Sequence, residues 1–571
     1  MSARPDLRGR RGVAALCVAA LLTLTGCLSL PVEGGVQVGL DRPPADGGLE
    51  IVAPGPSVDA APREIVEGFL LASSLGLGDD FHRAYEFMTT AGASQWDPLG
   101  GVTIYSDDEP PTIEVGDEGA DGLGVLVTVT VPVAATVGED GTYTEAPPDT
   151  VQPFRFHLVK VVDDQWRISQ LDPGVLMSEV TFGTQYREVS VYFLSSDAVP
   201  RLVPDLRWVP RARSVTSAVR ALLGGPAEWL TAPAVVSAFP DGTTLGIEGV
   251  EIDDRVATVS LSQQFLDASA ADRAYARTQL TETLRQLGQV SRVEISVDGN
   301  LLTLDPTLAP VDPAPAPLRG PTVLTEDGLG VVNGDQVSPV DAVVPDGVDD
   351  LAIPYGREPV VGLVDSRSLV ALGDGTTLLP PGGSLVPPSY DAQGWVWTGP
   401  TGPGSNEGSL LVVDPVSGAV ETVSAPDLAG ADVVALRVSR EGSRLAYALR
   451  TDESIVVHVA AVLRDADGRP TAIGPGRTVG GPLLQLRDLV WVGEVRLAVL
   501  AQTATIDLTV LLVGVGGQTV PLPSVEGAAS IAAGDGPREL VLVTAGGDLY
   551  GRSGNGWRMI LPGVRAPAFA G

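Results

Sequence analysis

The hydrophobic positions between residues 62 and 88 follow the period of an α-helix. Apolar side chains recur three and four residues apart in two groups: Ile65, Val66, Phe69 and Leu70, then Phe81, Ala84, Tyr85 and Met88. Residues at this spacing share one face of a helix, so the pattern predicts two amphipathic helices. Asp79 and Asp80 precede the second group and are of the type that caps a helix.

Strand-like patterns follow these helices at 101–105, 123–137, 151–162 and 165–171, with Asp163 and Asp164 as the turn between the last two. Two helices on one curved antiparallel sheet predict an α+β domain over residues 59–178, of the cystatin or nuclear transport factor two-like type. Such sheets often enclose a cone-shaped pocket. The side chains of Trp96, Tyr105, His157 and Trp166 either line that pocket or fill the core.

The region 187–303 alternates between strand and helix patterns. A strand pattern leads into a helical pattern over Ser214–Leu223, which two glycines and a proline then stop. A second helical pattern over 271–287 presents an apolar face toward a sheet that residues 293–297 complete. The region therefore predicts an α+β sandwich of sheet and helices.

Residues 304–320 are proline-rich and predict a linker, and beyond them almost every segment is a short strand or a turn. A faint repeat of a polar turn followed by an alternating strand occurs at Tyr390–Trp397, Ser439–Tyr447, Val492–Leu500 and Ala533–Val543. The copies lie roughly 40 to 50 residues apart, the length of a four-stranded propeller blade. Residues 321–571 therefore predict a β-propeller of about five or six blades, with a β-sandwich as the alternative. The expected fold class is multi-domain, α+β followed by all-β.

The first 26 residues have the layout of a signal peptide. Four arginines and a short apolar run precede Gly26 and Cys27. The run, residues 12–25, is shorter than the roughly 20 residues that cross a bilayer, which disfavours a permanent transmembrane helix. We expect residues 1–26 to be removed after export.

Residues Leu24 to Cys27 are similar to the lipobox of bacterial lipoproteins. The resemblance implies cleavage between Gly26 and Cys27, a diacylglycerol on the Cys27 sulfur and an acyl chain such as palmitate on its new amino terminus. Cys17 lies in the segment expected to be removed, so Cys27 is the thiol that stays. The alternative is an incidental thiol beside an ordinary cleavage site. Residues 27–58, rich in Pro, Gly and Asp, predict a lipidated N-terminus and flexible tether.

Composition adds a strand-rich and strongly acidic character. The chain of 571 residues holds 68 Gly and 47 Pro with only 5% aromatic residues, which favours strands and turns. Its formal charge is −34, so it would repel phosphate backbones, and we predict no nucleic-acid partner.

The sequence offers little catalytic chemistry. His82, His157 and His458 lack metal-ligand spacing, and neither a Gly-x-Ser-x-Gly elbow nor a phosphate loop occurs. We predict no enzyme activity, no metal and no cofactor. Acidic clusters at 107–109, 163–164, 253–254 and 349–350 are expected to be solvated loops. Two such carboxylates could alternatively form a glycosidic catalytic pair, and the loops have oxygen ligands for Ca²⁺ but no Asp-x-Asp-x-Asp-Gly motif.

Six segments of the region 187–303 carry a resemblance to a known domain. Read in order, they are Val189–Leu194, Leu202–Pro210, Ala218–Pro226, Phe239–Leu245, Ala257–Ser262 and Gln279–Leu284. They resemble the GerMN domain, which is named for spore germination and sporulation proteins and is found in cell-surface proteins.

The order of lipobox, tether, α+β domain, GerMN domain and propeller resembles the actinobacterial LpqB lipoprotein family. The resemblance implies a lipid-anchored protein on the extracytoplasmic face of the cell membrane. The implied partner is the extracytoplasmic part of the sensor histidine kinase MtrB, and the implied role is accessory to the MtrA and MtrB two-component system in cell-envelope homeostasis. Two other functions stay open: a cell-wall glycan-processing enzyme and a small-ligand receptor.

Overall fold

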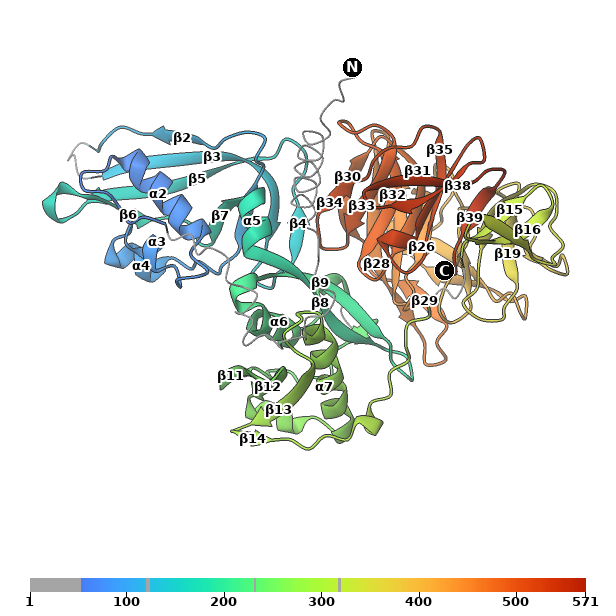
Figure 1. Ribbon diagram of the computed structural model, residues 1–571, viewed down its shortest axis with the longest axis horizontal. Helices are drawn as coiled ribbons and strands as arrows, with labels where there is room; N and C mark the ends of the chain where they lie inside the picture. Colours follow the sequence, from blue (N-terminus) through green and yellow to red (C-terminus); the bar gives the residue numbers. More distant parts are fainter. Residues whose placement is uncertain (1–52, 120–123, 231–232, 317–319) are drawn as a thin grey trace, which may run out of the picture. The chain divides into compact units, whose positions relative to one another are not determined.

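The computed structural model describes residues 53–119, 124–230, 233–316 and 320–571 (Figure 1). The expected signal peptide, Cys27 and most of the expected tether lie outside the described residues. No helix in these ranges is long and apolar enough to cross a membrane.

The helical pattern near the start forms three helices. They are α2 (Pro62–Ser74), α3 (His82–Tyr85) and α4 (Thr90–Gln95). The start of α2 is fixed by Pro62 in the first turn and by the Glu64 carboxylate, which accepts a hydrogen bond from the Ala61 backbone N–H at 2.8 Å. The expected second helix is only one turn long and ends at Tyr85. Thr89 then caps a new helix by accepting from the Gly92 N–H at 3.0 Å.

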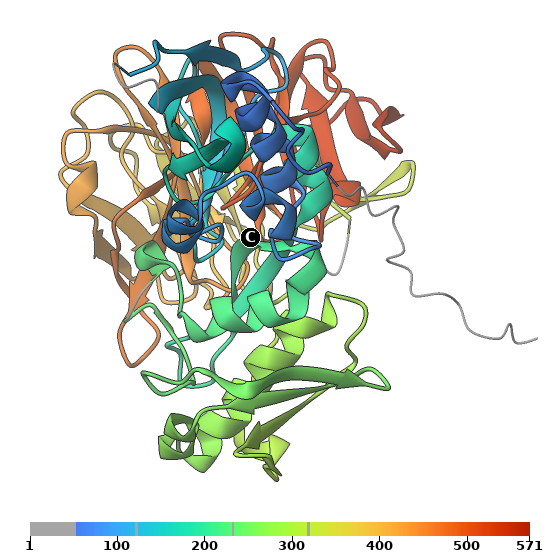
Figure 2. The ribbon, with the colours of Figure 1, turned by 90° about the vertical axis from the view of Figure 1, so that its left-hand side faces the viewer.

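A seven-stranded sheet accompanies these helices. Its strands are β1 (Val102–Tyr105), β2 (Thr112–Val115), β3 (Gly124–Val137), β4 (Tyr143–Glu145), β5 (Val151–Lys160), β6 (Trp166–Gln170) and β7 (Val175–Ser178). The order is β6-β5-β3-β1-β7, with β2 and β4 also paired to β3. Burial alternates along most of β3, and α2 packs on the sheet (Figures 1 and 2). The predicted helices on one sheet are confirmed, but the sheet is not wholly antiparallel, because β7 pairs parallel with β1. Strands β2, β4 and β7 are additional to those predicted.

The middle of the chain forms two smaller sheets with two main helices. After α5 (Glu179–Gln185), the first sheet contains β8 (Tyr186–Ser195), β9 (Leu202–Pro210) and β10 (Val235–Val236), and the second contains β11 (Leu245–Asp253), β12 (Val256–Leu261), β13 (Arg292–Val297) and β14 (Asn300–Leu301). The helices are α6 (Ser214–Leu223), whose bounds the sequence predicted, and α7 (Ala270–Arg285). Because α7 connects the parallel strands β12 and β13, it lies against β13.

Polar side chains of α7 satisfy the backbone of β8, a role the sequence analysis missed. The buried Gln279 amide donates to the Tyr192 carbonyl at 2.8 Å, and Thr283 Oγ1 accepts from the Tyr192 N–H at 3.1 Å. Gln286, which directly follows α7, exchanges two hydrogen bonds with the Ser190 backbone. The helix thus closes a strand edge that would otherwise keep unpaired buried groups.

Residues 322–568 form six four-stranded blades. Written in the order in which their strands pair, the blades are β39-β15-β16-β17, β18-β19-β20-β21, β22-β23-β24-β25, β26-β27-β28-β30, β31-β32-β33-β34 and β35-β36-β37-β38, and β29 links the third and fourth. Their bounds are β15 (Thr322–Thr325), β16 (Gly328–Asn333), β17 (Gln336–Pro339), β18 (Val348–Ala352), β19 (Val360–Val364), β20 (Ser368–Leu372), β21 (Thr377–Leu379), β22 (Ser389–Tyr390), β23 (Val396–Thr398), β24 (Ser409–Val413), β25 (Val420–Ser424), β26 (Asp432–Val438), β27 (Arg444–Arg450), β28 (Ile455–Arg464), β29 (Pro470–Ile473), β30 (Arg477–Leu483), β31 (Gln485–Val492), β32 (Arg496–Gln502), β33 (Thr509–Gly514), β34 (Thr519–Pro521), β35 (Ala528–Ala533), β36 (Leu540–Thr544), β37 (Leu549–Ser553), β38 (Gly556–Leu561) and β39 (Arg565–Ala568). Short 3₁₀ helices occupy Val162–Asp164, Arg211–Arg213, Glu228–Leu230, Gln263–Asp267, Pro306–Leu308, Pro426–Leu428 and Pro537–Glu539.

The predicted β-propeller is confirmed, and the last strand of the chain closes it. Strand β39 pairs antiparallel with β15, so one blade combines the first and last strands of the propeller (Figure 1). Such closure leaves no open end on the ring of blades.

The repeated polar turns connect the first and second strands of four blades. In one of them, buried Asp391 accepts hydrogen bonds from the Trp395 N–H at 2.9 Å, the Trp397 indole at 2.9 Å and Arg464 Nη2 at 2.8 Å. In the next blade, the buried Arg444 donates to Glu441 Oε1 at 2.7 Å. The polar residues of the repeat are therefore structural: they fix the turn between strands.

Candidate functional site

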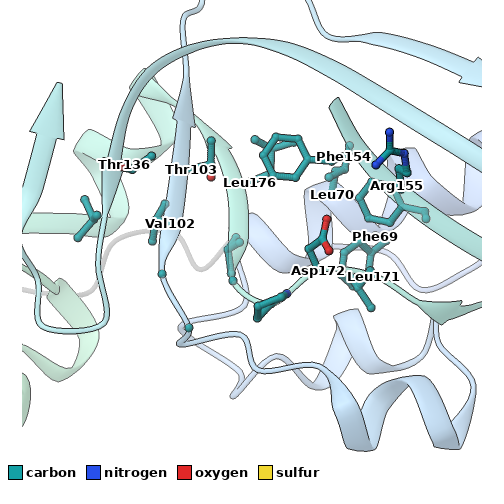
Figure 3. A pocket seen from close by; sticks show the side chains of 17 residues that line it. Phe69, Leu70, Val102, Thr103, Thr136, Phe154, Arg155, Leu171, Asp172 and Leu176 are labelled. Atoms are coloured by element: carbon teal, nitrogen blue, oxygen red, sulfur yellow. The ribbon is translucent and has the colours of Figure 1, made fainter. Parts of the chain in front are cut away.

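The first domain contains a cavity of about 200 Å³, which we call the apolar pocket (Figure 3). Its walls include Phe69, Leu70, Val102, Phe154, Phe156, Leu171, Val175 and Leu176, with the polar residues Thr103, Thr136, Arg155 and Asp172. Figure 3 shows Arg155 and Asp172 at the end formed by Phe69 and Phe154, and the two threonines at the other end.

The walls of the apolar pocket follow from the local periodicity. Phe69 and Leu70 project from α2, and Phe154 and Phe156 stand two apart on β5, with the exposed Arg155 between them. Side chains two apart on a strand share a face, so both rings lie on the same side of the sheet. Leu176 completes the wall from β7.

Two glycines form one side of the apolar pocket by letting two loops touch. Gly174 has a φ of +85°, and its N–H donates to the Asp97 carbonyl at 2.7 Å. A Cβ at Gly174 would lie 2.7 Å from the carbonyl oxygen of Gly101, which is closer than real contacts allow. Glycine is therefore required where these loops cross.

The chemistry of the apolar pocket suits binding. Apolar walls with a few polar groups are typical of small-molecule sites. A volume of about 200 Å³ is below the range of drug-sized sites, so it suits a small apolar group or one end of a longer molecule.

The propeller contains a second cavity, of about 60 Å³, which we call the axial pocket. Its walls come from the first strands of five blades and include Asp350 on β18, Arg437 on β26, Asp488 on β31 and Ser530 on β35. Tyr355, Arg440 and Trp491 also contribute.

Charged groups inside the axial pocket are mostly paired. Arg437 Nη2 lies 3.4 Å from Asp488 Oδ1, and both side chains are 15% exposed. Asp488 also accepts hydrogen bonds from the backbone N–H groups of Leu489 at 2.8 Å and Ile531 at 3.0 Å. Burial raises the pKa of Asp488. Burial and, to a smaller extent, the negative charge of Asp488 raise the pKa of Asp350 to about 6.

Trp96, Tyr105, His157 and Trp166 were expected either to line a pocket in the first domain or to fill its core. Trp96 and Trp166 are buried in the core and Tyr105 is half-buried, while His157 is exposed; the apolar pocket is lined by other residues. The Trp96 indole donates to the Gly174 carbonyl at 3.0 Å, which holds it beside the pocket wall. The sequence signal that could have identified the pocket is the pair Phe154 and Phe156, which stand two residues apart on β5.

Three of the four acidic clusters are exposed, as expected. The side chains at 107–109, 163–164 and 253–254 lie on exposed turns, and Asp349 is also exposed. Asp350 contradicts the expectation of a solvated loop, because it lies within β18 and faces the axial pocket. Two adjacent acids in a sequence resemble a solvated loop. In a strand, however, adjacent side chains point to opposite faces, so only Asp349 points outward.

The histidines do not form a site. His82 is exposed on α3, and His458 lies on β28 with its ring stacked 5.3 Å from that of Tyr447. Burial lowers the pKa of His458. Across the described ranges, no group of three or more His, Cys, Asp and Glu side chains is arranged to hold a metal ion.

Comparisons with known proteins cover most of the chain. Residues 55–183 match the family model described as the lipoprotein LpqB N-terminal domain, residues 190–303 match the model for sporulation and spore germination, and residues 327–570 match the lipoprotein LpqB β-propeller domain.

Individual relatives give the same picture. A lipoprotein LpqB of Streptomyces coelicolor is 29% identical over 99% of this chain and 99% of its own length. One of Thermobifida fusca is 28% identical over 88% of this chain and 89% of its own length. The first GerMN domain of the sporulation protein GerM from Bacillus subtilis, a solved structure, is 21% identical with a TM-score of 0.18, covering 20% of this chain and 86% of that domain's chain.

Proposed function

This chain belongs to the LpqB lipoprotein family, and we propose that it binds another envelope protein from a lipid anchor on the outer face of the cell membrane. The partner we propose is the ectodomain of an MtrB-like sensor histidine kinase, whose signalling in cell-envelope homeostasis this protein biases. We propose three folded domains, with bounds at residues 59–178, 187–303 and 321–571.

The proposed anchor is Cys27, exposed as the new N-terminus by cleavage after Gly26. Two or three acyl chains at about 0.8 kcal/mol per buried CH₂ make such an attachment nearly permanent. A tether of about 30 residues reaches on the order of 30 Å and holds the folded part near the bilayer. A partner in the same membrane then meets it at a raised effective concentration, so a modest affinity suffices.

The observation that most favours protein binding is the placement of the acidic clusters. The side chains at 107–109, 163–164 and 253–254 are exposed on separate turns instead of converging on a cleft. Exposed loops on rigid strands are the usual carriers of binding specificity. Together with the formal charge of −34, they favour a basic or neutral partner surface and an association that salt weakens.

The carboxylates of the axial pocket are poorly suited to glycan processing. Asp350 and Asp488 are the two acids that line the axial pocket, whose volume of about 60 Å³ holds roughly two water molecules. A sugar ring does not fit in that space, and the reaction also needs two carboxyl groups on either side of the scissile bond. We therefore propose a binding protein without enzyme activity.

Lipidation is tested by mass spectrometry of the mature N-terminus. The expected species is a diacylglyceryl and N-acyl cysteine at position 27, and Cys27→Ala is expected to give an unprocessed or released chain. An unmodified N-terminal residue other than Cys27 would exclude the anchor.

Partner binding is tested by calorimetry between the Cys27→Ala chain and the kinase ectodomain of the same organism. We expect direct binding that weakens from low to high salt. Two double variants show which exposed turn contributes to binding. One replaces Asp253 and Asp254 by Asn, and the other replaces Asp163 and Asp164 by Asn. Absence of binding at every salt concentration would count against the kinase as partner.

A second function, binding of a small apolar ligand, is favoured by the apolar pocket. Phe69, Phe154, Phe156 and Leu176 line its walls. NMR titration with hexanol is the simplest probe, because the molecule matches the size of the cavity. Thr136→Trp, which fills the pocket from its exposed end, is expected to abolish the shifts, while Thr144→Trp on the neighbouring β4 is expected to leave them unchanged. Equal shifts in both variants would show that hexanol binds elsewhere.

A further inference from the structure

Strand β11 is an edge strand of its sheet (Figure 1). In the described ranges it pairs with β12 alone, and the residues after Leu245 form no backbone hydrogen bond to any other element. A two-residue turn follows the strand at Asp254 and Arg255, which both have positive φ. The pair beside such a turn is hydrogen-bonded and the next pair is not, so the N–H and C=O of Ile252 point outward.

The outer side of β11 is exposed along much of its length. Ile247 is fully exposed and Ile252 is 41% exposed, and the acids Glu251 and Asp253 are exposed beside it. An exposed edge strand with unpaired backbone groups and apolar side chains is a template for pairing with another strand. The occupant that this edge calls for is therefore an extended segment.

A groove of about 500 Å³ lies between α6 and the first half of β11. Thr216, Arg220 and Leu223 line it from one face of α6, since they stand four and three residues apart. On the other side, the ladder between β11 and β12 is interrupted between Leu245 and Val250, and the intervening residues form a bulge. An extended peptide in such a groove bonds to the strand and places alternate side chains against the helix.

The charges beside β11 differ between its two ends. Arg220 is exposed at the groove and forms no ion pair with any residue that the structure describes. Glu251 and Asp253, near the turn, are likewise without an ion pair in that part of the chain. A complementary segment therefore has an acidic group at the groove end and a basic residue at the turn end.

We propose that β11 receives an extended segment of a partner protein as an additional strand. An acidic group of the segment lies beside Arg220, and a basic residue lies beside Glu251 and Asp253. Backbone hydrogen bonds to β11 supply affinity, and the groove selects the side chains that enter it. The inference rests on the proposed function for the source of the segment, a partner in the same membrane, whereas the site itself is testable without that partner.

The main test is selection of a phage-displayed library of random peptides of about ten residues on the full chain in detergent. We expect enriched peptides with an acidic residue toward one end, a basic residue toward the other and apolar residues between. Their affinities are then measured by fluorescence polarisation. Ile252→Pro removes the outward N–H and keeps the pairing with β12, and is expected to weaken binding by at least about tenfold.

Ile252→Thr is the matched control, because it keeps the outward N–H and a β-branched side chain, and it is expected to change affinity by less than about twofold. Arg220→Glu gives an independent readout. It is expected to weaken the same peptides, and exchange of their acidic residue for lysine is expected to restore binding to this variant. Absence of enrichment, or equal binding to the unsubstituted chain and to Ile252→Pro, would overturn the proposal.

The kinase ectodomain, assayed with the same variants, separates this proposal from the proposed function. Peptide binding with the expected variant pattern, without binding of the ectodomain, would support the strand site and count against the kinase as partner. Ectodomain binding that is lost in Ile252→Pro and kept in Ile252→Thr would support both. Ectodomain binding that is equal in the two variants would support the kinase as partner and overturn the strand site.

Discussion

The apolar pocket and the axial pocket place their charges differently. In the apolar pocket, Arg155 and Asp172 are exposed at one end and the walls are hydrocarbon. In the axial pocket, Asp350, Arg437 and Asp488 lie inside. A charge at an exposed rim keeps its water, whereas a charge inside must be matched by another group. Loss of one charged side chain should therefore matter little in the first pocket and greatly in the second.

The largest expected effect is that of Asp488→Ala. It leaves the Arg437 guanidinium, whose side chain is 15% exposed, without its acidic partner. Removing one member of a buried pair costs about 3–5 kcal/mol. Asp172→Ala at the exposed rim of the apolar pocket is expected to stay within about 0.5 kcal/mol. Denaturant unfolding monitored by tryptophan fluorescence compares them, and similar losses of stability would remove the distinction between the pockets.

The pH dependence of Asp350 gives the next largest effect. Its folded pKa of about 6 lies above the ordinary value of 3.8, so the folded state binds this proton more tightly than the unfolded state does. The stabilisation is full below the ordinary pKa and is lost as pH rises through 6. Between pH 4 and 7, Asp350→Asn should gain on the order of 2–3 kcal/mol relative to the unsubstituted protein. A stability difference that does not change with pH would contradict the assignment.

Truncation of the hydrocarbon wall should have a smaller effect. Leu176 is 6% exposed and borders a cavity already, so Leu176→Ala is expected to cost about 2 kcal/mol, at the low end for buried leucine. Leu158 is 1% exposed in the core of the same domain, and Leu158→Ala is expected to cost about 4 kcal/mol. Thermal unfolding of both variants shows which substitution causes the larger loss of stability. The reverse order would mean that the apolar pocket is closed and packed in solution.

Periodicity in the sequence predicted many of the elements, although strand β7 was missed and Asp350 of β18 was expected in a loop. The helix Ser214–Leu223 and the polar turns of the propeller followed from apolar spacing and from glycine and proline signals. Those signals are local, and so they report on local structure.

The residues that face the pockets were harder to predict, because their neighbours are far away in sequence. The sequence around Asp350 resembles an acidic loop. In the fold, β31 and β35 bring Asp488 and Ser530 to the axial pocket that Asp350 also lines. Gln279 reads as a polar position on a helix surface, yet it bonds the backbone of β8. Trp96 and Trp166 were expected either to line a pocket or to fill the core, and the structure buries both in the core.

The central claim, that this lipoprotein acts on a partner in its own membrane, is tested most directly by crosslinking in intact cells. The native chain is compared with one in which the lipobox and Cys27 are replaced by an ordinary secretion signal, at matched amounts outside the cell. Confinement by the anchor predicts that the native chain captures the kinase ectodomain more efficiently and that the untethered chain loses both capture and signalling output. Equal capture and equal signalling by the two forms would contradict the account.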